Sequence, residues 1–249
     1  MVETGARDHR FIPASGVCNF RDMGGLPTED GRRIRPGKLY RSDHWRYATR
    51  ADRELTRRAP AIRNIIDLRT SGERSEHGVF PVAAGQTLHE LTMVHLTWDR
   101  FDGTDADPAV HGDLPGFLAQ RYAAVMETGW ESVRDSLNVV AGGDPTLVHC
   151  MSGTDRTGIV IAVALSLAGV SDEEIAADYV LSNVGVDRIR ARRAGVDPAD
   201  YEGASDHCRV ETIPAAFAMV RERFGSIETY ARVIGLTDVA ALRRSLVES

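Results

Sequence analysis

The stretch from residue 146 to residue 168 constrains the fold of this chain more than any other part of its sequence. It runs Thr-Leu-Val-His, then Cys-Met-Ser-Gly-Thr-Asp-Arg-Thr-Gly, and then an apolar series from Ile159 to Ala168. A short apolar run, a segment of small and polar residues, and a longer apolar run predict a buried strand, a tight loop and a buried helix. The loop residues should therefore lie at the amino-terminal end of a helix and at the edge of a sheet.

Short apolar runs also alternate with helical periods along the rest of the chain, which predicts an α/β domain. The expected strands are residues 16–20, 38–41, 62–68, 88–96 and 146–149. One helix is indicated by apolar residues at helical spacing before a pair of glycines: Trp130, Val133, Leu137, Val140, Gly142 and Gly143. Such glycines are typical of a helix carboxyl end.

The last hundred residues are predicted to be a succession of helices. Ser171 and Glu174 have the spacing of a capping box, which predicts a helix from there to about Asn183. Further on, Ser226 and Thr237 are expected to cap the amino-terminal ends of helices, and Gly225 and Gly235 are expected to separate them. The carboxyl-terminal third should therefore be helical.

Size and charge narrow the class of protein. A chain of 249 residues with 43% hydrophobic residues can bury one sizeable core, so we expect a single domain over residues 1–249. The formal net charge of -6 argues against a nucleic-acid partner, because such binding depends largely on Lys and Arg.

The cysteines and the hydropathy indicate a cytoplasmic protein. Cys18, Cys150 and Cys208 are odd in number, far apart and not at metal-ligand spacing, which suits a reducing compartment. Residues 1–10 lack the apolar centre of a secretory signal, and no apolar run reaches the roughly 18 residues of a membrane span. Stable membrane insertion is therefore not expected. Signal-independent secretion and the oligomeric state stay open.

Two segments carry opposite charge. Residues 31–50 hold seven Lys or Arg against Asp43, and residues 99–113 hold five Asp against Arg100. The acidic segment, which also contains Gly and Pro, is expected to be a solvated loop. The basic one is either an ordinary solvated surface or a positive field for an anionic substrate.

Cys150 and Arg156 are the residues that indicate chemistry. A loop that enters the amino-terminal end of a helix directs N–H groups and the positive end of the helix dipole at one point, which favours a bound phosphate and a thiolate. We therefore expect Cys150 to be an ionised nucleophile. Arg156, six positions later, can bind two phosphoryl oxygens through its planar guanidinium. The alternative is an inert buried thiol.

The backbone between these residues is expected to surround the phosphate as a phosphate-binding loop, or P-loop. N–H groups placed around the equatorial oxygens stabilise the charge that develops in phosphoryl transfer. The expected phosphate-binding residues are Met151, Ser152, Gly153, Thr154 and Thr157. Gly153 permits the bend, and the Thr157 hydroxyl is expected to donate to the sulfur of Cys150.

Several separated motifs, together with this loop, resemble the atypical bacterial tyrosine phosphatases and their dual-specificity relatives. They are Asn19-Phe20-Arg21-Asp22-Met23-Gly24-Gly25, Leu39-Tyr40-Arg41-Ser42, Ile66-Asp67-Leu68-Arg69 and Asp178-Tyr179-Val180-Leu181-Ser182-Asn183. The likeness covers about residues 13–247. It implies one phosphatase domain, with a mostly parallel central sheet flanked by helices.

The resemblance also implies an activity, and one residue of the loop departs from the family's pattern. The family's enzymes hydrolyse phosphotyrosine, so phosphorylated proteins or small phosphomonoesters are the expected substrates and inorganic phosphate the product. Phosphoserine, phosphothreonine and phosphoinositides are further candidates. Thr154 stands where the family has lysine, a second cation in the loop, and this substitution argues against phosphoinositide hydrolysis.

The acid that protonates the leaving group is expected to be Asp155 or Asp99. The resemblance implies the loop residue Asp155, whereas Asp99 begins the acidic segment, where a mobile acid could lie. We favour Asp155. The alternatives are an ion-pair partner of Arg156 for Asp155 and a solvated loop residue for Asp99.

Six further residues are expected to support the loop. Asn19, Arg21 and Asp22 would tie the amino-terminal segment beneath it, or else form an ordinary turn. Asp67 and Arg69 would buttress it by an ion pair, or pair only for structure, and His149 would orient the cysteine through hydrogen bonds.

The expected reaction has two steps and needs no metal or cofactor. Cys150 attacks phosphorus, Asp155 protonates the leaving group, and water hydrolyses the phosphocysteine. The alternatives are an enzyme of the sulfurtransferase or arsenate reductase kind, and a phosphate-binding module without catalysis.

Overall fold

The computed structural model describes residues 10–58, 61–94 and 113–248. In this part of the chain a five-stranded sheet has the order β1-β2-β5-β3-β4. Its strands are β1 (Arg21–Asp22), β2 (Leu39–Ser42), β3 (Asn64–Asp67), β4 (Thr87–Glu90) and β5 (Thr146–His149). Only β1 runs antiparallel to its neighbour. The predicted α/β class with a mostly parallel sheet is confirmed.

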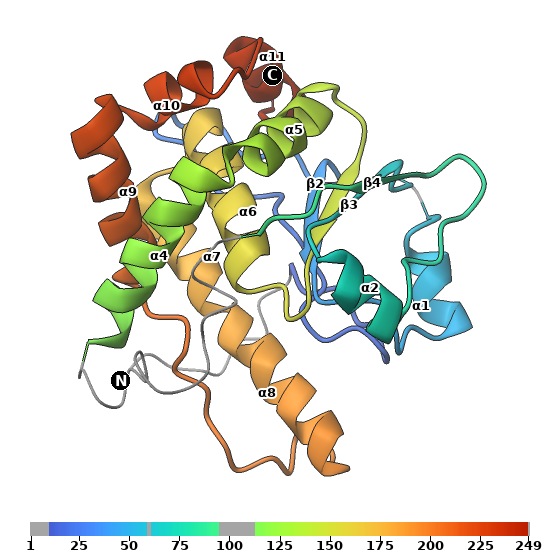
Figure 1. Cartoon of the computed structure of the whole chain (residues 1–249). Coiled ribbons are helices and arrows are strands. Elements are labelled where there is room, and N and C mark those ends of the chain that lie inside the picture. Colours follow the sequence, from blue (N-terminus) through green and yellow to red (C-terminus); the bar gives the residue numbers. More distant parts are fainter. Residues whose placement is uncertain (1–9, 59–60, 95–112, 249) are drawn as a thin grey trace.

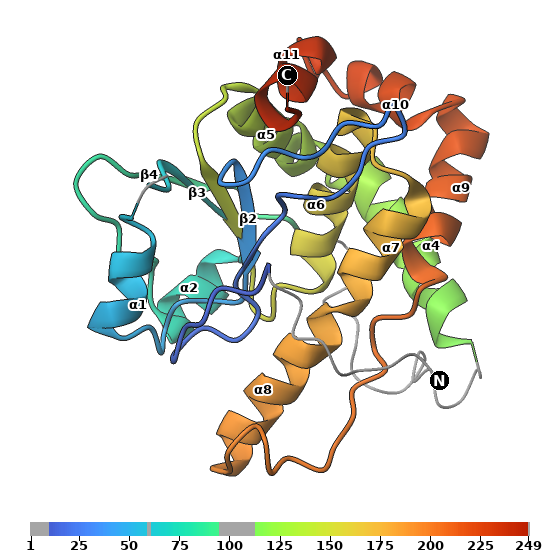
Figure 2. The same ribbon diagram turned by 180° about the vertical axis from the view of Figure 1, so that it is seen from behind.

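Helices lie on both sides of this sheet (Figure 1). The described helices are α1 (Arg50–Leu55), α2 (Ser71–His77), α4 (Leu114–Thr128), α5 (Trp130–Ala141), α6 (Asp155–Ala168), α7 (Asp172–Val180), α8 (Ser182–Ala194), α9 (Thr212–Phe224), α10 (Ile227–Val233) and α11 (Val239–Leu246). The view from behind shows α8 extending beyond the rest of the body (Figure 2). None of the helices described here has both the length and the apolar character needed to cross a membrane.

Alternate residues of the central strands pack into two different hydrophobic cores. Ile66 and Val148 pack with α4, α6 and the last helices, whereas Ile65 and Leu147 face a smaller cluster that includes Trp45. This alternation is what a strand buried on both faces requires. The carboxyl ends of β3 and β5 thus meet at one edge of a sheet that is covered on both faces.

Four of the five predicted strands are found: residues 146–149 have the predicted bounds, the strand predicted at 38–41 is shifted by one residue, and that predicted at 62–68 is shorter. Residues 88–96 form a strand only as far as Glu90, and residues 95–96 lie outside the described part. The strand predicted at residues 16–20 is wrong, because the backbone N–H groups of Cys18 and Asn19 donate to the Asp43 carboxylate and not to a neighbouring strand. The strand begins later, at Arg21.

The predicted helix signals are partly confirmed. Helix α5 ends at Ala141, just before the glycine pair, and Ser226 caps α10. Ser171 caps α7 by accepting from the Glu174 N–H at 3.4 Å, but within the described chain the reciprocal half of the capping box is not formed. That helix also ends earlier than predicted, at Val180.

The cap predicted at Thr237 is wrong. Asp238 takes this role, and its carboxylate accepts from the backbone N–H of Ala241 at 2.7 Å.

Candidate active site

The loop from Cys150 to Thr154 joins the carboxyl end of β5 to the amino-terminal end of α6, as predicted, and lies beside α2 (Figure 1). Cys150 is buried, with 1% of its surface exposed. Gly153 has a φ of 71°, and a Cβ there would lie 2.4 Å from the backbone oxygen of Ser42. The bend therefore requires glycine for both its dihedral angle and its space.

Carbonyl groups of the loop are bound from one side. The Asn19 side-chain amide donates to the oxygens of Ser152 and Gly153, each at 3.1 Å, and Arg41 donates to the Gly153 oxygen at 2.7 Å. In contrast, the backbone N–H groups of residues 151–154 donate to no group in the described part of the chain. These free donors lie at a helix amino terminus, the arrangement that favours a bound anion.

A buried ion cluster holds Asn19 and Arg41 in place. Arg21 and Arg41 donate to the Asp178 carboxylate at 3.0 and 2.7 Å, and Arg21 also donates to the Asn19 side-chain oxygen. Burial opposes ionisation of Asp178, but the charges of Arg21, Arg41 and Arg10 hold its pKa well below the usual range. Arg21 thus acts on the loop through Asn19.

Asp22 does not reach the loop. Its two carboxylate oxygens accept from the backbone N–H groups of Gly24 and Gly37 at 2.8 and 2.7 Å. The prediction that it ties the amino-terminal segment beneath the loop is wrong, because both oxygens are used within the turns that flank β1 and β2.

Arg156 lies in the first turn of α6 and is paired with Glu73. Its two terminal nitrogens donate to the two Glu73 oxygens at 2.7 and 2.6 Å. Burial disfavours the charged guanidinium, but hydrogen bonding to Glu73 and the charges of Glu73 and Asp155 hold the Arg156 pKa above its usual value. Arg156 is therefore an oriented cation close to the sulfur.

Sequence reasoning missed Glu73, although a signal for it exists. Thr70 and Glu73 form a complete capping box at the start of α2, the Ser/Thr-x-x-Glu pattern. The pattern marks a helix start directly after β3, and parallel strands end at a common edge. The ion pair that the same Glu73 carboxylate forms with Arg156 is visible only in the folded structure.

Asp155 is held by two side chains that the sequence did not indicate. Its Oδ1 accepts from the hydroxyl of Tyr122 at 2.5 Å and contacts Nε2 of His207 at 2.9 Å. Burial disfavours the carboxylate, but the hydrogen bond and charge of His207, with Tyr122 and Arg156, hold the Asp155 pKa below its usual value. These partners come from α4 and from the segment between α8 and α9.

Asp67, Arg69 and His149 form a buried group behind the loop. Arg69 donates to both Asp67 oxygens at 2.9 and 2.7 Å, and His149 Nε2 lies 3.7 Å from Asp67. The other ring nitrogen of His149 lies 3.3 Å from the Cys150 carbonyl oxygen. Burial lowers the pKa of His149, so this ring is neutral and suited to orienting the backbone.

The hydroxyl groups of the loop are used in different ways. Those of Ser152 and Thr154 are hydrogen-bonded to each other, and Thr154 is buried. The Thr157 hydroxyl is also buried but has no partner in the described chain, so the predicted hydrogen bond to the Cys150 sulfur is not formed. Asp99, the alternative acid, lies outside the described residues.

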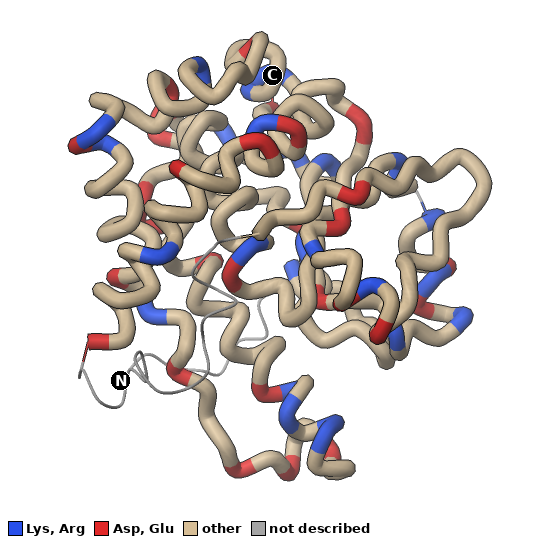
Figure 3. Tube along the Cα trace, in the orientation of Figure 1, with Lys and Arg blue, Asp and Glu red and all other residues tan. Residues whose placement is uncertain are grey.

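The basic residues of segment 31–50 are mostly used in the fold. Arg41 belongs to the buried cluster, Arg32 pairs with Asp30, and Lys38 donates to the Gly143 carbonyl. Arg192 and Arg193 of α8 line a cavity that also includes Met151, and Figure 3 shows the basic residues of this helix in blue. Among the described residues no group of three His, Cys, Asp or Glu could hold a metal ion.

Two cavities differ in their relation to the loop. One of about 260 Å³ includes Met151, with His44, Tyr47, His77 and Arg192 among its other lining residues. It therefore adjoins the residue that follows Cys150.

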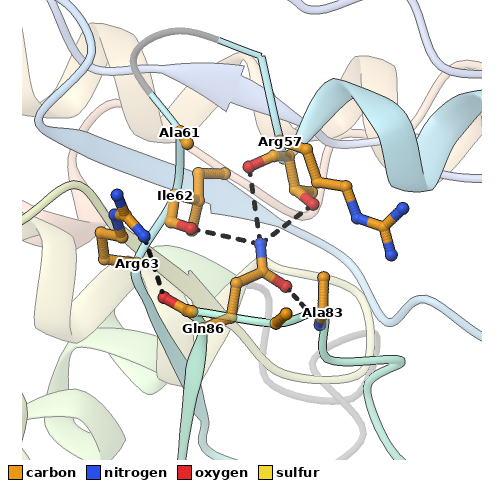
Figure 4. A pocket seen from close by; sticks show the side chains of 9 residues that line it. Arg57, Ala61, Ile62, Arg63, Ala83 and Gln86 are labelled. Atoms are coloured by element: carbon orange, nitrogen blue, oxygen red, sulfur yellow. Dashed lines mark hydrogen bonds between the residues drawn. The ribbon is translucent and has the colours of Figure 1, made fainter.

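The other cavity, of about 510 Å³, lies at the amino ends of β3 and β4, the edge of the sheet opposite Cys150 (Figure 4). Gln86 crosses it and donates to the Thr56 hydroxyl and the Ile62 carbonyl at 3.1 and 3.2 Å. These bonds tie structural segments together, so this cavity is no part of the candidate site.

Comparison with known proteins adds an independent finding. Residues 12–248 match the model of the tyrosine phosphatase family. The chain is 31% identical over 244 residues to a protein of Cupriavidus necator that bears a provisional tyrosine-protein phosphatase name, covering 91% of this chain and 85% of that protein. It is 27% identical over 267 residues to the triple specificity protein phosphatase PtpB of Mycobacterium tuberculosis, covering 92% and 95%.

Proposed function

The chain belongs to the tyrosine phosphatase family and is a protein-tyrosine phosphatase, and on this premise we propose that it works through a phosphocysteine on Cys150. The observation that supports this mechanism most directly is the set of free N–H groups at residues 151–154, beside a buried cysteine and an oriented Arg156. Hydrogen-bond donors arranged in this way can bind the equatorial oxygens of a phosphoryl group while it is transferred.

In the first step the Cys150 sulfur forms a bond to phosphorus while the bond to the leaving oxygen breaks. Arg156 and the loop N–H groups hold the three equatorial oxygens, and a proton moves from Asp155 to the leaving oxygen. In the second step water attacks phosphorus and gives its proton to Asp155. The sulfur leaves as a thiolate, and inorganic phosphate is released.

We propose phosphotyrosine in proteins as the preferred substrate. The cavity beside Met151 is lined by aromatic side chains and by arginines of α8, which suits an aryl phosphate with acidic neighbours. Because one relative is named a triple specificity phosphatase, phosphoserine or phosphothreonine peptides and phosphoinositides are proposed as weaker substrates. We further propose that the chain is one phosphatase domain, since its main core joins residues from Met23 to Val247.

The mechanism is tested with Cys150→Ser and the matched control Cys18→Ser, another buried cysteine. We expect C150S to abolish turnover of 4-nitrophenyl phosphate and C18S to retain it. Rapid quenching of the unmodified enzyme during turnover should leave a phosphoryl group on the peptide that contains Cys150. Full activity of C150S, or loss of wild-type activity to a chelator, would exclude the mechanism.

A further inference from the structure

We propose that His207 is the positioning residue of the acid step: it orients the Asp155 carboxyl group toward the leaving oxygen and stabilises the carboxylate that forms. His207 lies in the irregular segment between α8 and α9, 52 residues from Asp155 in sequence, and its Nε2 is 2.9 Å from Asp155 Oδ1. The inference rests on the proposed function, because it assumes that Asp155 is the acid.

Both contacts of the carboxyl group fall on the same oxygen. Tyr122 donates to Oδ1 at 2.5 Å and His207 approaches the same atom, whereas Oδ2 accepts no hydrogen bond from the described residues. A proton donor needs one oxygen free to meet the leaving group. The two contacts to Oδ1 therefore fix the rotation of the carboxyl group and leave Oδ2 for the reaction.

Other charged and titratable groups surround the pair on each packed element. Tyr179 of α7 contacts the Tyr122 hydroxyl at 2.7 Å, and Arg156 follows Asp155 directly in α6. Cys208, Asp206 and Arg190 also lie near the pair, and of these Arg190 opposes a charged His207 whereas Asp206 favours it.

The balance of these groups favours a charged histidine. The hydrogen bond to Asp155 outweighs burial and raises the pKa of His207, while the Asp155 pKa is lowered. The pair thus keeps one exchangeable proton to higher pH than an isolated aspartic acid would.

The proton can be followed through both steps. In the resting pair the proton is on His207. In the reactive tautomer His207 has released its Nδ1 proton to solvent and Oδ2 has taken one from solvent, so that neutral His207 still donates its Nε2–H to Oδ1. As the phosphorus–oxygen bond breaks and the sulfur–phosphorus bond forms, the Oδ2 proton moves to the leaving oxygen. The new carboxylate is stabilised by His207 and Tyr122. When water later attacks phosphorus, Oδ2 takes its proton and the sulfur leaves.

The experiment compares a leaving group that needs a proton with one that does not. For His207→Ala we expect kcat on phenyl phosphate to fall about tenfold or more, and kcat on 4-nitrophenyl phosphate to change less than about threefold. The falling alkaline side of the phenyl phosphate profile should move to lower pH. His207→Gln, which can still donate to Oδ1 but cannot titrate, should recover much of kcat while keeping the shifted profile.

The matched control is His89→Ala, since His89 lies on β4 and contacts Asn64. If H207A does not fold, the pH profile of H207Q alone decides whether the inference holds. An equal loss on both substrates, or an unchanged profile in H207Q, would overturn the inference. Failure of the proposed function is a separate result, because it would appear as full activity in Cys150→Ser.

Discussion

Arg156 and Glu73 form a bidentate ion pair beside the loop that follows β5, with nitrogen–oxygen distances of 2.7 and 2.6 Å. Glu73 also accepts from the backbone N–H of Thr70 at 2.7 Å, as part of the capping box of α2. One carboxylate therefore joins a helix start to Arg156, the arginine that we propose binds phosphate. A paired guanidinium is held in one plane, which lowers the cost of ordering it around a phosphoryl group.

Glu73→Gln should weaken catalysis by releasing Arg156. We expect kcat/KM for 4-nitrophenyl phosphate to fall about tenfold, because the charge-assisted hydrogen bonds that orient the guanidinium are lost. The control Thr70→Ala removes the cap hydroxyl but keeps the ion pair, so it should lower Tm while preserving kcat/KM. Equal kinetic losses in the two variants would mean that α2, and not the orientation of Arg156, matters.

Gly153→Ala should disrupt the loop more than the same change at Gly195. Both glycines have a φ of 71°, but an added Cβ meets the Ser42 backbone at Gly153 and open space at Gly195. The dihedral strain alone costs roughly 1–2 kcal/mol, so G195A should be mildly less stable and fully active. G153A should lose most activity. Activity measured beside urea unfolding checks this, and similar behaviour of the two variants would show that the contact with Ser42 is not limiting.

Asp178→Ala should destabilise the fold strongly, because it leaves Arg21 and Arg41 buried without their partner. The expected loss is about 3–5 kcal/mol in urea unfolding. Asp172→Ala on the same helix is the control: it breaks a partly exposed pair with Arg221, worth up to about 1 kcal/mol. Since the folded Asp178 pKa is depressed, its stabilisation is present at neutral pH and is lost as the pH falls below the range of an unfolded carboxyl group. A D178A variant whose acid unfolding matches wild type would contradict this.

Asp43→Asn should show the opposite pH dependence. Burial raises the pKa of Asp43 to about 6, so between about pH 4 and 6 the folded chain keeps a proton that the unfolded chain has lost, and stability falls as pH rises. Asn retains the oxygen that accepts from Cys18 and Asn19. At pH 7 the variant should be more stable by about 2–3 kcal/mol, with the difference gone below about pH 4. Unfolding curves that keep the same spacing at both pH values would refute it.

Thr154→Lys should broaden the substrate range toward phosphoinositides. The added cation can interact with a second phosphate of the head group, and a partly solvated pair is worth about 1 kcal/mol, or about fivefold in kcat/KM. Thr154→Val is the control, since it removes the hydroxyl bonded to Ser152 without adding charge. The measurement is the ratio of phosphoinositide to phosphotyrosine-peptide turnover. No rise in that ratio for T154K would mean that position 154 does not set lipid specificity.

The sequence alone determined the class of the fold and the strand, loop and helix that we propose bear the chemistry. The strand, loop and helix around Cys150 follow from local properties: apolar runs that are buried, a glycine where φ is positive, and a polar segment between them. The same is true of α5, whose apolar period and terminal glycines are short-range signals. Such signals are encoded within a few residues of the element that they form.

Tertiary structure alone decided which further side chains hold Arg156 and Asp155. Glu73, Tyr122 and His207 reach Arg156 and Asp155 from 83, 33 and 52 residues away. Asp22, by contrast, lies within a predicted motif, yet its side chain bonds only to the turns that flank β1 and β2. No local pattern specifies these contacts, because each depends on how separate helices pack against the sheet. The roles of the arginines in residues 31–50 also depend on the tertiary structure. Burial and nearby carboxylates determine whether each of these charges stabilises the fold or faces a substrate.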